Sequence, residues 1–177
     1  MNTEHINENG EGSYKLPLAM VGFSSALPVR ILTMSDVFDQ PEVWLALQGF
    51  LVAFFWEMFQ MPYFAMDHLS AWEVTKSCGI ASIGDSGIMV FAYWIASRIV
   101  GDRLWLQQAA FLPVCTYLTT GLIITIAFEH LALRSDWGWQ YSDLMPTIFG
   151  IGIVPIVMWI AVPLIALKFA ARMVAHK

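Results

Sequence analysis

Three acidic side chains stand inside long apolar stretches of the sequence. Glu57 lies in FFWEMFQMPYF, Asp85 lies in CGIASIGDSGIM, and Glu129 ends a third apolar stretch beside His130. An ionisable group within a membrane span costs roughly 2.5 to 3.5 kcal/mol on insertion scales, so each is a candidate for a functional role. We therefore take Glu57, Asp85 and Glu129 as candidate catalytic acids.

Asp85 is accompanied by other polar side chains at helical spacing, so it is not an isolated charge in its apolar stretch. Cys78, Ser82, Asp85 and Met89 follow one another at spacings of four, three and four residues. Residues three and four apart lie on the same face of an α-helix. The spacing therefore predicts that Asp85 shares one helical face with small polar side chains.

Polar and aromatic residues accompany the acids. Gln60 follows Glu57 by three positions and is expected on the same helical face. Trp159, one turn after Pro155, either floors a pocket or fills the core. The residues that we expect to contact a ligand are Trp56, Gln60, Ser82, His130, Tyr141 and Trp159.

Carboxylates that lie close together in a low-dielectric site cannot all be ionised, so at least one is expected to hold a proton at neutral pH. Such a group can act as a general acid, a proton carrier or a structural hydrogen-bond donor. In the structural alternative, Glu57 with Gln60 and Asp85 with Ser82 only join neighbouring helices, at about 0.6 kcal/mol per contact. The sequence leaves both interpretations open.

No metal site is predicted from these residues, and no cofactor is identified. Glu57, Asp85, Glu129, His68 and His130 could supply ligands. However, no spacing such as HExxH supports a metal centre.

Four apolar stretches must position the acids. A hydrocarbon core of roughly 30 Å takes about 20 helical residues to cross. The predicted spans are residues 43–64, 78–100, 108–131 and 145–169. Residues 16–32 form a shorter apolar stretch that includes Pro, Gly and Arg, so we interpret it as interfacial or re-entrant, with a fifth span as the alternative. The sequence thus predicts an all-α, polytopic transmembrane helical bundle.

The composition favours a membrane protein. Of 177 residues, 58% are hydrophobic and 13% are charged, where a soluble domain has roughly 25% charged residues. The net charge of −5 has no compact basic block behind it, which argues against a nucleic-acid partner. Cys78 and Cys115 fall at or inside apolar stretches, which indicates packing roles. We expect residues 1–15 to be a disordered cytosolic tail and residues 16–177 to form a single transmembrane domain.

The orientation follows from the basic residues, which are retained on the cytosolic side of spans. Seven of the nine Lys and Arg residues fall on one predicted side: Lys15, Arg30, Arg98, Arg103, Lys168, Arg172 and Lys177. Only Lys76 and Arg134 fall on the other. We therefore expect both termini in the cytosol and the chain in the cell (inner) membrane. The expected aromatic belts are Trp44 and Trp105 inside, and Tyr63, Trp72, Trp137, Trp139 and Tyr141 outside.

This orientation predicts where the acids meet. At about 1.5 Å per residue, Glu57 and Asp85 are both expected about 10 Å below the outer boundary, with Glu129 close to it. Polar loop residues are expected above them: Asp67, His68, Asp136, Tyr141 and Asp143. The three acids should therefore converge on the outer half of the bundle.

Two short patterns resemble known membrane proteins. The Trp56–Glu57 pair resembles the Trp-Glu of membrane-bound terpene cyclases, in which a buried acid protonates a lipophilic substrate. The last two spans, with Glu129 ending one and Trp159 in the next, are similar in layout to the sterol-isomerase and sigma-2-receptor superfamily. Ala53 stands where that superfamily has a histidine. The resemblances cover these few residues and imply acid chemistry on isoprenoids.

Three functions remain open from the sequence. The first is a carboxylate-lined pocket that binds a small isoprenoid- or lipid-like ligand, or acts on it as a membrane isomerase or cyclase. The second is an accessory or assembly subunit whose polar seams face a membrane partner or a second copy of the chain. The third is a proton- or cation-coupled transporter, for which the inner halves of the spans offer few polar groups: Gln48, Thr116 and Thr119.

Overall fold

The computed structural model describes residues 38–135 and 138–175. Four long helices dominate it: α2 (Pro41–Gln60), α3 (Ala71–Val100), α4 (Phe111–Ala132) and α5 (Ile153–Ala175). Each is long and apolar enough to cross a membrane. The prediction of a mostly helical chain with four such helices is confirmed. The segments predicted as a tail (residues 1–15) and as an interfacial piece (residues 16–32) lie outside the described residues.

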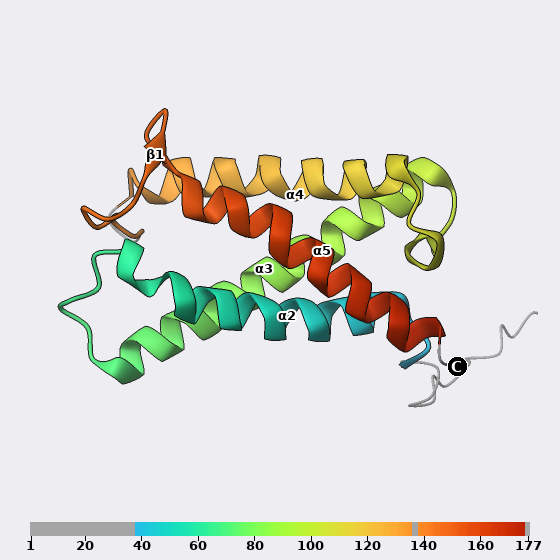
Figure 1. The fold of residues 1–177 in the computed structure, drawn as a ribbon, viewed down its shortest axis with the longest axis horizontal. Coiled ribbons are helices and arrows are strands. Elements are labelled where there is room, and N and C mark those ends of the chain that lie inside the picture. Colours follow the sequence, from blue (N-terminus) through green and yellow to red (C-terminus); the bar gives the residue numbers. More distant parts are fainter. Residues whose placement is uncertain (1–37, 136–137, 176–177) are drawn as a thin grey trace, which may run out of the picture. The chain divides into compact units, whose positions relative to one another are not determined.

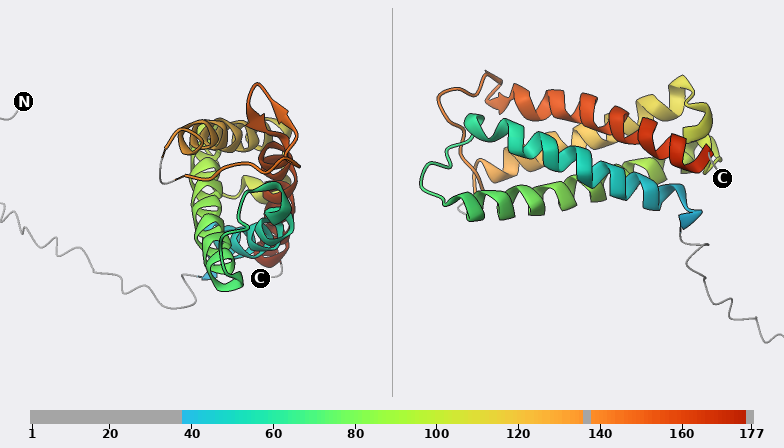
Figure 2. Two further views of the ribbon diagram at one scale, coloured as in Figure 1. Left: turned by 90° about the vertical axis from the view of Figure 1, so that its left-hand side faces the viewer. Right: turned by 60° about the horizontal axis from the view of Figure 1, so that its bottom comes forward.

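Successive helices run in opposite directions and form a four-membered ring (Figures 1 and 2). α2 packs on α3 and α5, and α4 packs on α3 and α5. One end of this bundle carries residues 61–70, 133–135 and 138–152, and we call it the hairpin end. The other end carries the start of α2, residues 101–110 and the end of α5, and we call it the arginine end because Arg98 and Arg103 lie there.

The helix α3 begins seven residues earlier than the predicted span, at Ala71 instead of Cys78. Its first turn is stabilised by a capping box, in which Ser70 and Glu73 each accept a hydrogen bond from the other's backbone N–H. α3 ends at Gly101, whose φ of 71° is the left-handed conformation that glycine adopts without strain. Polar residues before the apolar run therefore extend the helix.

The fourth helix begins later than predicted, at Ile153 instead of residue 145. The residues before it form a two-stranded antiparallel hairpin of β1 (Thr147–Ile148) and β2 (Ile151–Gly152). Phe149 and Gly150 connect the strands with positive φ angles of 52° and 79°, as a tight hairpin turn requires. Two short 3-10 turns complete the described structure: η1 (Met61–Tyr63) and η2 (Trp105–Gln108).

Small residues allow the helices to approach closely, as in membrane bundles generally. Ala53, Ala92, Ala96 and Ala166 are completely buried in the core. α4 and α5 meet closely at one position, where a Cβ built on Gly121 would lie 2.3 Å from the ring of Trp159. The indole of Trp159 is 1% exposed, so it fills the core at this crossing.

Many large apolar side chains point away from the bundle. Phe55 is 76% exposed, Ile83 is 65% exposed and Phe111 is 85% exposed. A water-soluble protein exposes few contiguous apolar surfaces of this kind. The outward-facing surface is therefore compatible with a lipid environment. By contrast, Trp105, predicted for the inner aromatic belt, is only 3% exposed and packs inside the bundle.

We expect Gly121→Ala to destabilise the bundle by about 1–3 kcal/mol, because the added methyl group forces the buried Trp159 ring to shift. Gly87→Ala is the matched control, since a methyl group added at Gly87 would meet nothing within 4 Å. Alanine favours a helix by about 1 kcal/mol over glycine, so the control should be neutral or slightly stabilising. Thermal unfolding in detergent measures both, and equal midpoints for the two variants would contradict the close α4–α5 contact.

Candidate functional site

Glu129 is held at the hairpin end by two donors from the segment that follows α4. Its Oε2 atom accepts a hydrogen bond from the Tyr141 hydroxyl at 2.5 Å and another from Trp139 Nε1 at 3.2 Å. Alternate residues of an extended segment point to the same side, which explains how both side chains reach one oxygen. Glu129 is 6% exposed, so this carboxylate is buried although it lies at the end of its helix.

Tyr141 also connects the site to the start of α5. Its hydroxyl oxygen accepts a hydrogen bond from Gly152 N at 2.9 Å while its proton is donated to Glu129. Burial, followed by the hydrogen bond to Glu129, raises the pKa of Tyr141 above its usual value. The phenol therefore remains a donor throughout the physiological pH range.

The two loops of the hairpin end are joined by backbone hydrogen bonds. Ala65 N donates to Gln140 O at 3.0 Å, and Ser142 N donates to Tyr63 O at 3.0 Å. Phe64 and Tyr141 form a β-bridge between these hydrogen bonds. The segment that carries Trp139 and Tyr141 is thus fixed to the end of α2 as well as to Glu129.

Glu57 is held within α2 by a relay of side chains. Trp56 Nε1 donates to Gln60 Oε1 at 2.9 Å, and Gln60 Nε2 donates to Glu57 Oε1 at 2.8 Å. Gln60 is buried, and its amide is satisfied inside the protein because its oxygen accepts one of these hydrogen bonds and its nitrogen donates the other. The structure therefore brings together three of the predicted site residues, Trp56, Glu57 and Gln60, on one helical turn.

Asp85 lies deeper in the bundle than Glu57, in contrast to the equal depth that we predicted. A Cβ added at Gly49 of α2 would lie 3.7 Å from Ser86 Cα of α3, so Asp85 is level with the part of α2 around Gly49, eight residues and about 12 Å along the axis from Glu57. Ser86, next to Asp85, donates to Ala46 O at 2.8 Å, near the start of α2. The difference arises because α3 begins at Ala71, which moves Asp85 toward the middle of the helix.

The three acids nevertheless interact electrostatically. Glu57 and Glu129 both act on Asp85, and Glu129 acts on Glu57. Helical side chains lean toward the N-terminus of their helix. Because α2 and α3 are antiparallel, Glu57 and Asp85 lean toward each other and reduce their difference in depth.

Hydrogen bonding separates the three acids into two kinds. Glu57 and Glu129 accept hydrogen bonds from amide, phenol and indole donors. Asp85 Oδ2 is buried and has no hydrogen-bond partner among the described residues. A buried polar atom without a partner costs about 1–3 kcal/mol, so Asp85 has bonding capacity that the described residues do not use.

Three other predicted ligand contacts lie outside this group. His130 is on the exposed side of α4 and contacts Arg134. Ser82 is completely buried and donates to Cys78 O within its own helix at 2.7 Å. Trp159 packs against Gly121 in the core. The structure therefore gives each of them a packing or hydrogen-bonding contact with residues other than the acids.

Further polar groups line the inside of α4 and the arginine end, and of these Tyr117, Ser97 and Tyr93 were not singled out from the sequence. Thr125 Oγ1 and the Tyr117 hydroxyl are buried without a partner among the described residues. Trp105 Nε1 donates to Ser97 Oγ at 3.1 Å, and the Tyr93 hydroxyl donates to Arg103 O. Tyr117 and Thr125 are eight residues apart, a helical spacing that indicates a shared face of α4.

Two clefts are present at the arginine end, away from the acids. One, of about 460 Å³, is lined by Glu42, Trp94, Ser97, Arg98, Gly101 and Arg103. The other, of about 550 Å³, lies between η2, the start of α4 and the end of α5. Within residues 38–135 and 138–175, no three His, Cys, Asp or Glu side chains are placed to hold a metal ion, and Cys78 and Cys115 are free thiols.

Comparison of the chain with protein families, with curated proteins and with solved structures found no match.

We expect Tyr141→Phe to destabilise the protein by about 1–3 kcal/mol, because it removes a donor to buried Glu129 and an acceptor for Gly152 N–H. Tyr63→Phe is the control, since no hydrogen bond through the Tyr63 hydroxyl is present in the described part of the chain. Thermal unfolding in detergent followed by tryptophan fluorescence compares the variants. If both phenylalanine variants melt with the wild type, the Glu129–Tyr141 contact does not hold the hairpin end.

Proposed function

We propose that the chain is a multi-pass protein of the cell (inner) membrane that uses Glu57, Asp85 and Glu129 to bind a small lipophilic ligand. The proposal includes acid–base chemistry on that ligand, whose class would be isoprenoid- or lipid-like. Its first support is the apolar length and outward-facing side chains of the four helices. Its second support is the long-range electrostatic interaction among three acids contributed by three different helices.

The observation that carries the proposal is the buried, unpartnered Oδ2 atom of Asp85. Among the three acids, Glu57 and Glu129 are already engaged by donors of the protein. A hydroxyl or other donor of a ligand would satisfy Asp85 and recover the free energy lost by burying it. Asp85 is therefore the residue that we assign to direct ligand contact.

The acid chemistry follows from the same arrangement. Three carboxylates close together in a low-dielectric environment favour retention of a proton on one of them. A carboxylic acid without an internal partner can give that proton to a carbon–carbon double bond or to a leaving oxygen of the ligand. In this scheme Asp85 donates the proton, while Glu57 and Glu129 stabilise the positive charge that develops on the ligand.

The membrane orientation is part of the proposal. Arg98, Arg103 and Arg172 lie toward the arginine end, where Pro41 and Ala175 also lie. Basic residues near span ends favour the cytosolic side. We therefore place the arginine end in the cytosol and the hairpin end, with the two glutamates, toward the outer face.

Reporter fusions test this orientation. A green fluorescent protein fused after Lys177 should fluoresce in a bacterial host, because it folds in the cytosol but not after export through the general secretory route. Alkaline phosphatase fused at the same position should be inactive, and the same enzyme inserted after Asp143 should be active. Activity of the C-terminal phosphatase fusion would reverse the proposed topology.

Retention of a lipophilic molecule tests the role of Asp85. Wild-type protein and Asp85→Asn are purified from membranes in mild detergent, extracted with organic solvent and compared by mass spectrometry. We expect at least one small lipophilic species in the wild-type extract to fall about tenfold in the variant, since a buried polar group that loses its hydrogen-bond partner costs about 1–3 kcal/mol.

Asp143→Asn is the matched control, because it makes the same change at an exposed carboxylate of the hairpin end. It should retain the species at the wild-type level, and both variants should unfold at the wild-type temperature. If the wild type and both variants give identical extracts, the proposal of a ligand on Asp85 is contradicted, and the acids have a structural role only.

A further inference from the structure

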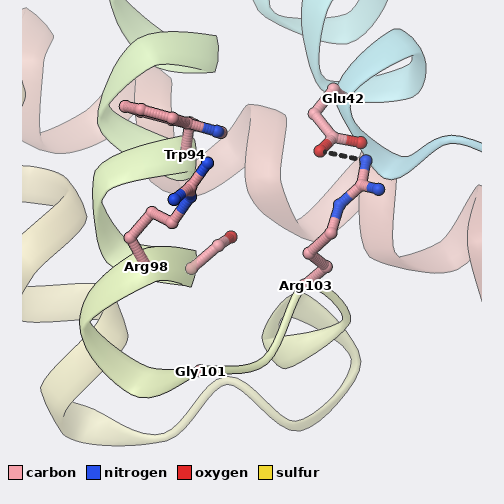
Figure 3. A pocket seen from close by; sticks show the side chains of 6 residues that line it. Glu42, Trp94, Arg98, Gly101 and Arg103 are labelled. Carbon is pink, nitrogen blue, oxygen red and sulfur yellow. Dashed lines mark hydrogen bonds and ion pairs between the residues drawn. The ribbon is translucent and has the colours of Figure 1, made fainter.

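The cleft of about 460 Å³ at the arginine end has an unusual distribution of charge (Figure 3). Trp94 and Arg98 form one side of it, and the ion pair of Glu42 with Arg103 forms the other. Glu42 belongs to the first turn of α2, while Trp94 and Arg98 belong to the last two turns of α3. Acidic and basic groups therefore face each other across a space at the end of the bundle.

Arg98 has unused hydrogen-bonding capacity. Its guanidinium carbon lies 4.6 Å from the centroid of the Trp94 ring, which is a cation–π contact. Across residues 38–135 and 138–175, no carboxylate forms an ion pair with Arg98. A guanidinium stacked on an aromatic face keeps the N–H donors along its edge free, and these donors match the oxygens of a phosphate.

Glu42 has the complementary capacity. Its Oε1 atom accepts a hydrogen bond from Arg103 Nη2 at 2.7 Å, whereas Oε2 is buried and has no partner in the described part of the chain. The terminal torsion of a glutamate is soft and moves both oxygens together, so a turn of the carboxylate brings Oε2 toward the cleft, and either oxygen can accept from Arg103. An ammonium group that entered the cleft would supply the missing donor.

The position of the cleft identifies the kind of molecule that reaches it. Helix ends in a bundle of this length lie at the boundary between the hydrocarbon core and the lipid headgroups. Tryptophan and arginine side chains are typical of this boundary, where the ring remains in the apolar layer and the charge reaches the headgroups. The placement of the cleft at this boundary rests on the membrane insertion proposed above, but not on the role proposed for Asp85.

We propose that this cleft binds a phosphoethanolamine group, with the phosphate on Arg98 and the primary ammonium on Glu42. The source of that group is a phosphatidylethanolamine molecule of the surrounding bilayer. Arg103 holds the Glu42 carboxylate in place. This carboxylate attracts the ammonium of a zwitterion and repels a simple anion, so the cleft should accept the zwitterion in preference. The ligand remains unchanged, and the site anchors the arginine end at the headgroup level.

Native mass spectrometry of the full chain in detergent tests the proposal, with phosphatidylethanolamine, phosphatidylcholine and phosphatidylglycerol of identical acyl chains as probes. We expect phosphatidylethanolamine to bind about tenfold more tightly than phosphatidylcholine, whose methylated nitrogen has no N–H to donate. Arg98→Gln and Glu42→Gln should each weaken phosphatidylethanolamine binding about tenfold. Glu42→Gln keeps an amide oxygen for Arg103, so the fold of this end is preserved.

Two control variants test whether lipid binding depends on the residues of this cleft or on charged residues elsewhere in the bundle. Arg172→Gln removes an exposed basic side chain at the same end and outside the cleft, so it should bind lipid as the wild type does. Asp85→Asn should also bind phosphatidylethanolamine normally, which distinguishes failure of this proposal from failure of the carboxylate site. Soluble phosphoethanolamine at millimolar concentration should not displace the lipid; displacement would support the same chemistry with a soluble source.

Equal binding of phosphatidylethanolamine and phosphatidylcholine, or wild-type binding by both Arg98→Gln and Glu42→Gln, would overturn the proposal. Tighter binding of phosphatidylglycerol than of phosphatidylethanolamine would also overturn it, because it would show an anion site that makes no use of Glu42.

Discussion

The cost of burying acidic side chains among apolar helices constrains the hairpin end of this protein. A carboxylate that leaves water must find donors nearby, and Glu129 finds them in Trp139 and Tyr141. Tyr141 in turn contacts Gly152 at the start of α5, and its segment pairs with the end of α2. One buried acid thereby links three helix ends, so local hydrogen bonding determines how the connecting loops fold over the bundle.

The sequence predicted the elements better than their ends. Apolar length identified all four helices, and the spacing from Cys78 to Met89 identified the buried face of α3. The start of α3 was missed because a capping box, not hydrophobicity, begins that helix. The hairpin before α5 was missed because the predicted span took in its apolar residues Ile148, Phe149 and Ile151, whereas a left-handed turn at Phe149 and Gly150 separates them into two strands.

The contacts of individual acids could be predicted only in part. Gln60 was expected beside Glu57 because helical spacing is local, and the structure joins them at 2.8 Å. The partners of Glu129 come from an irregular segment, for which no periodic pattern gives the geometry. The inward position of Trp105 was also missed, since a tryptophan beside a span is compatible with a belt or a core position. Tertiary packing decided between these positions.

The length of α3 has a consequence for how the bundle fits a bilayer. With 30 residues it measures about 45 Å, against roughly 30 Å of hydrocarbon, while its three neighbours have 20 to 23 residues. In Figure 1 it runs obliquely behind the other helices. Such a helix meets the mismatch by tilting and by raising its polar first turns above the lipid tails. A change in membrane thickness would then affect α3 before the other helices. In a thinner bilayer the tilt of α3 would increase, while the three shorter helices would still match the hydrocarbon layer.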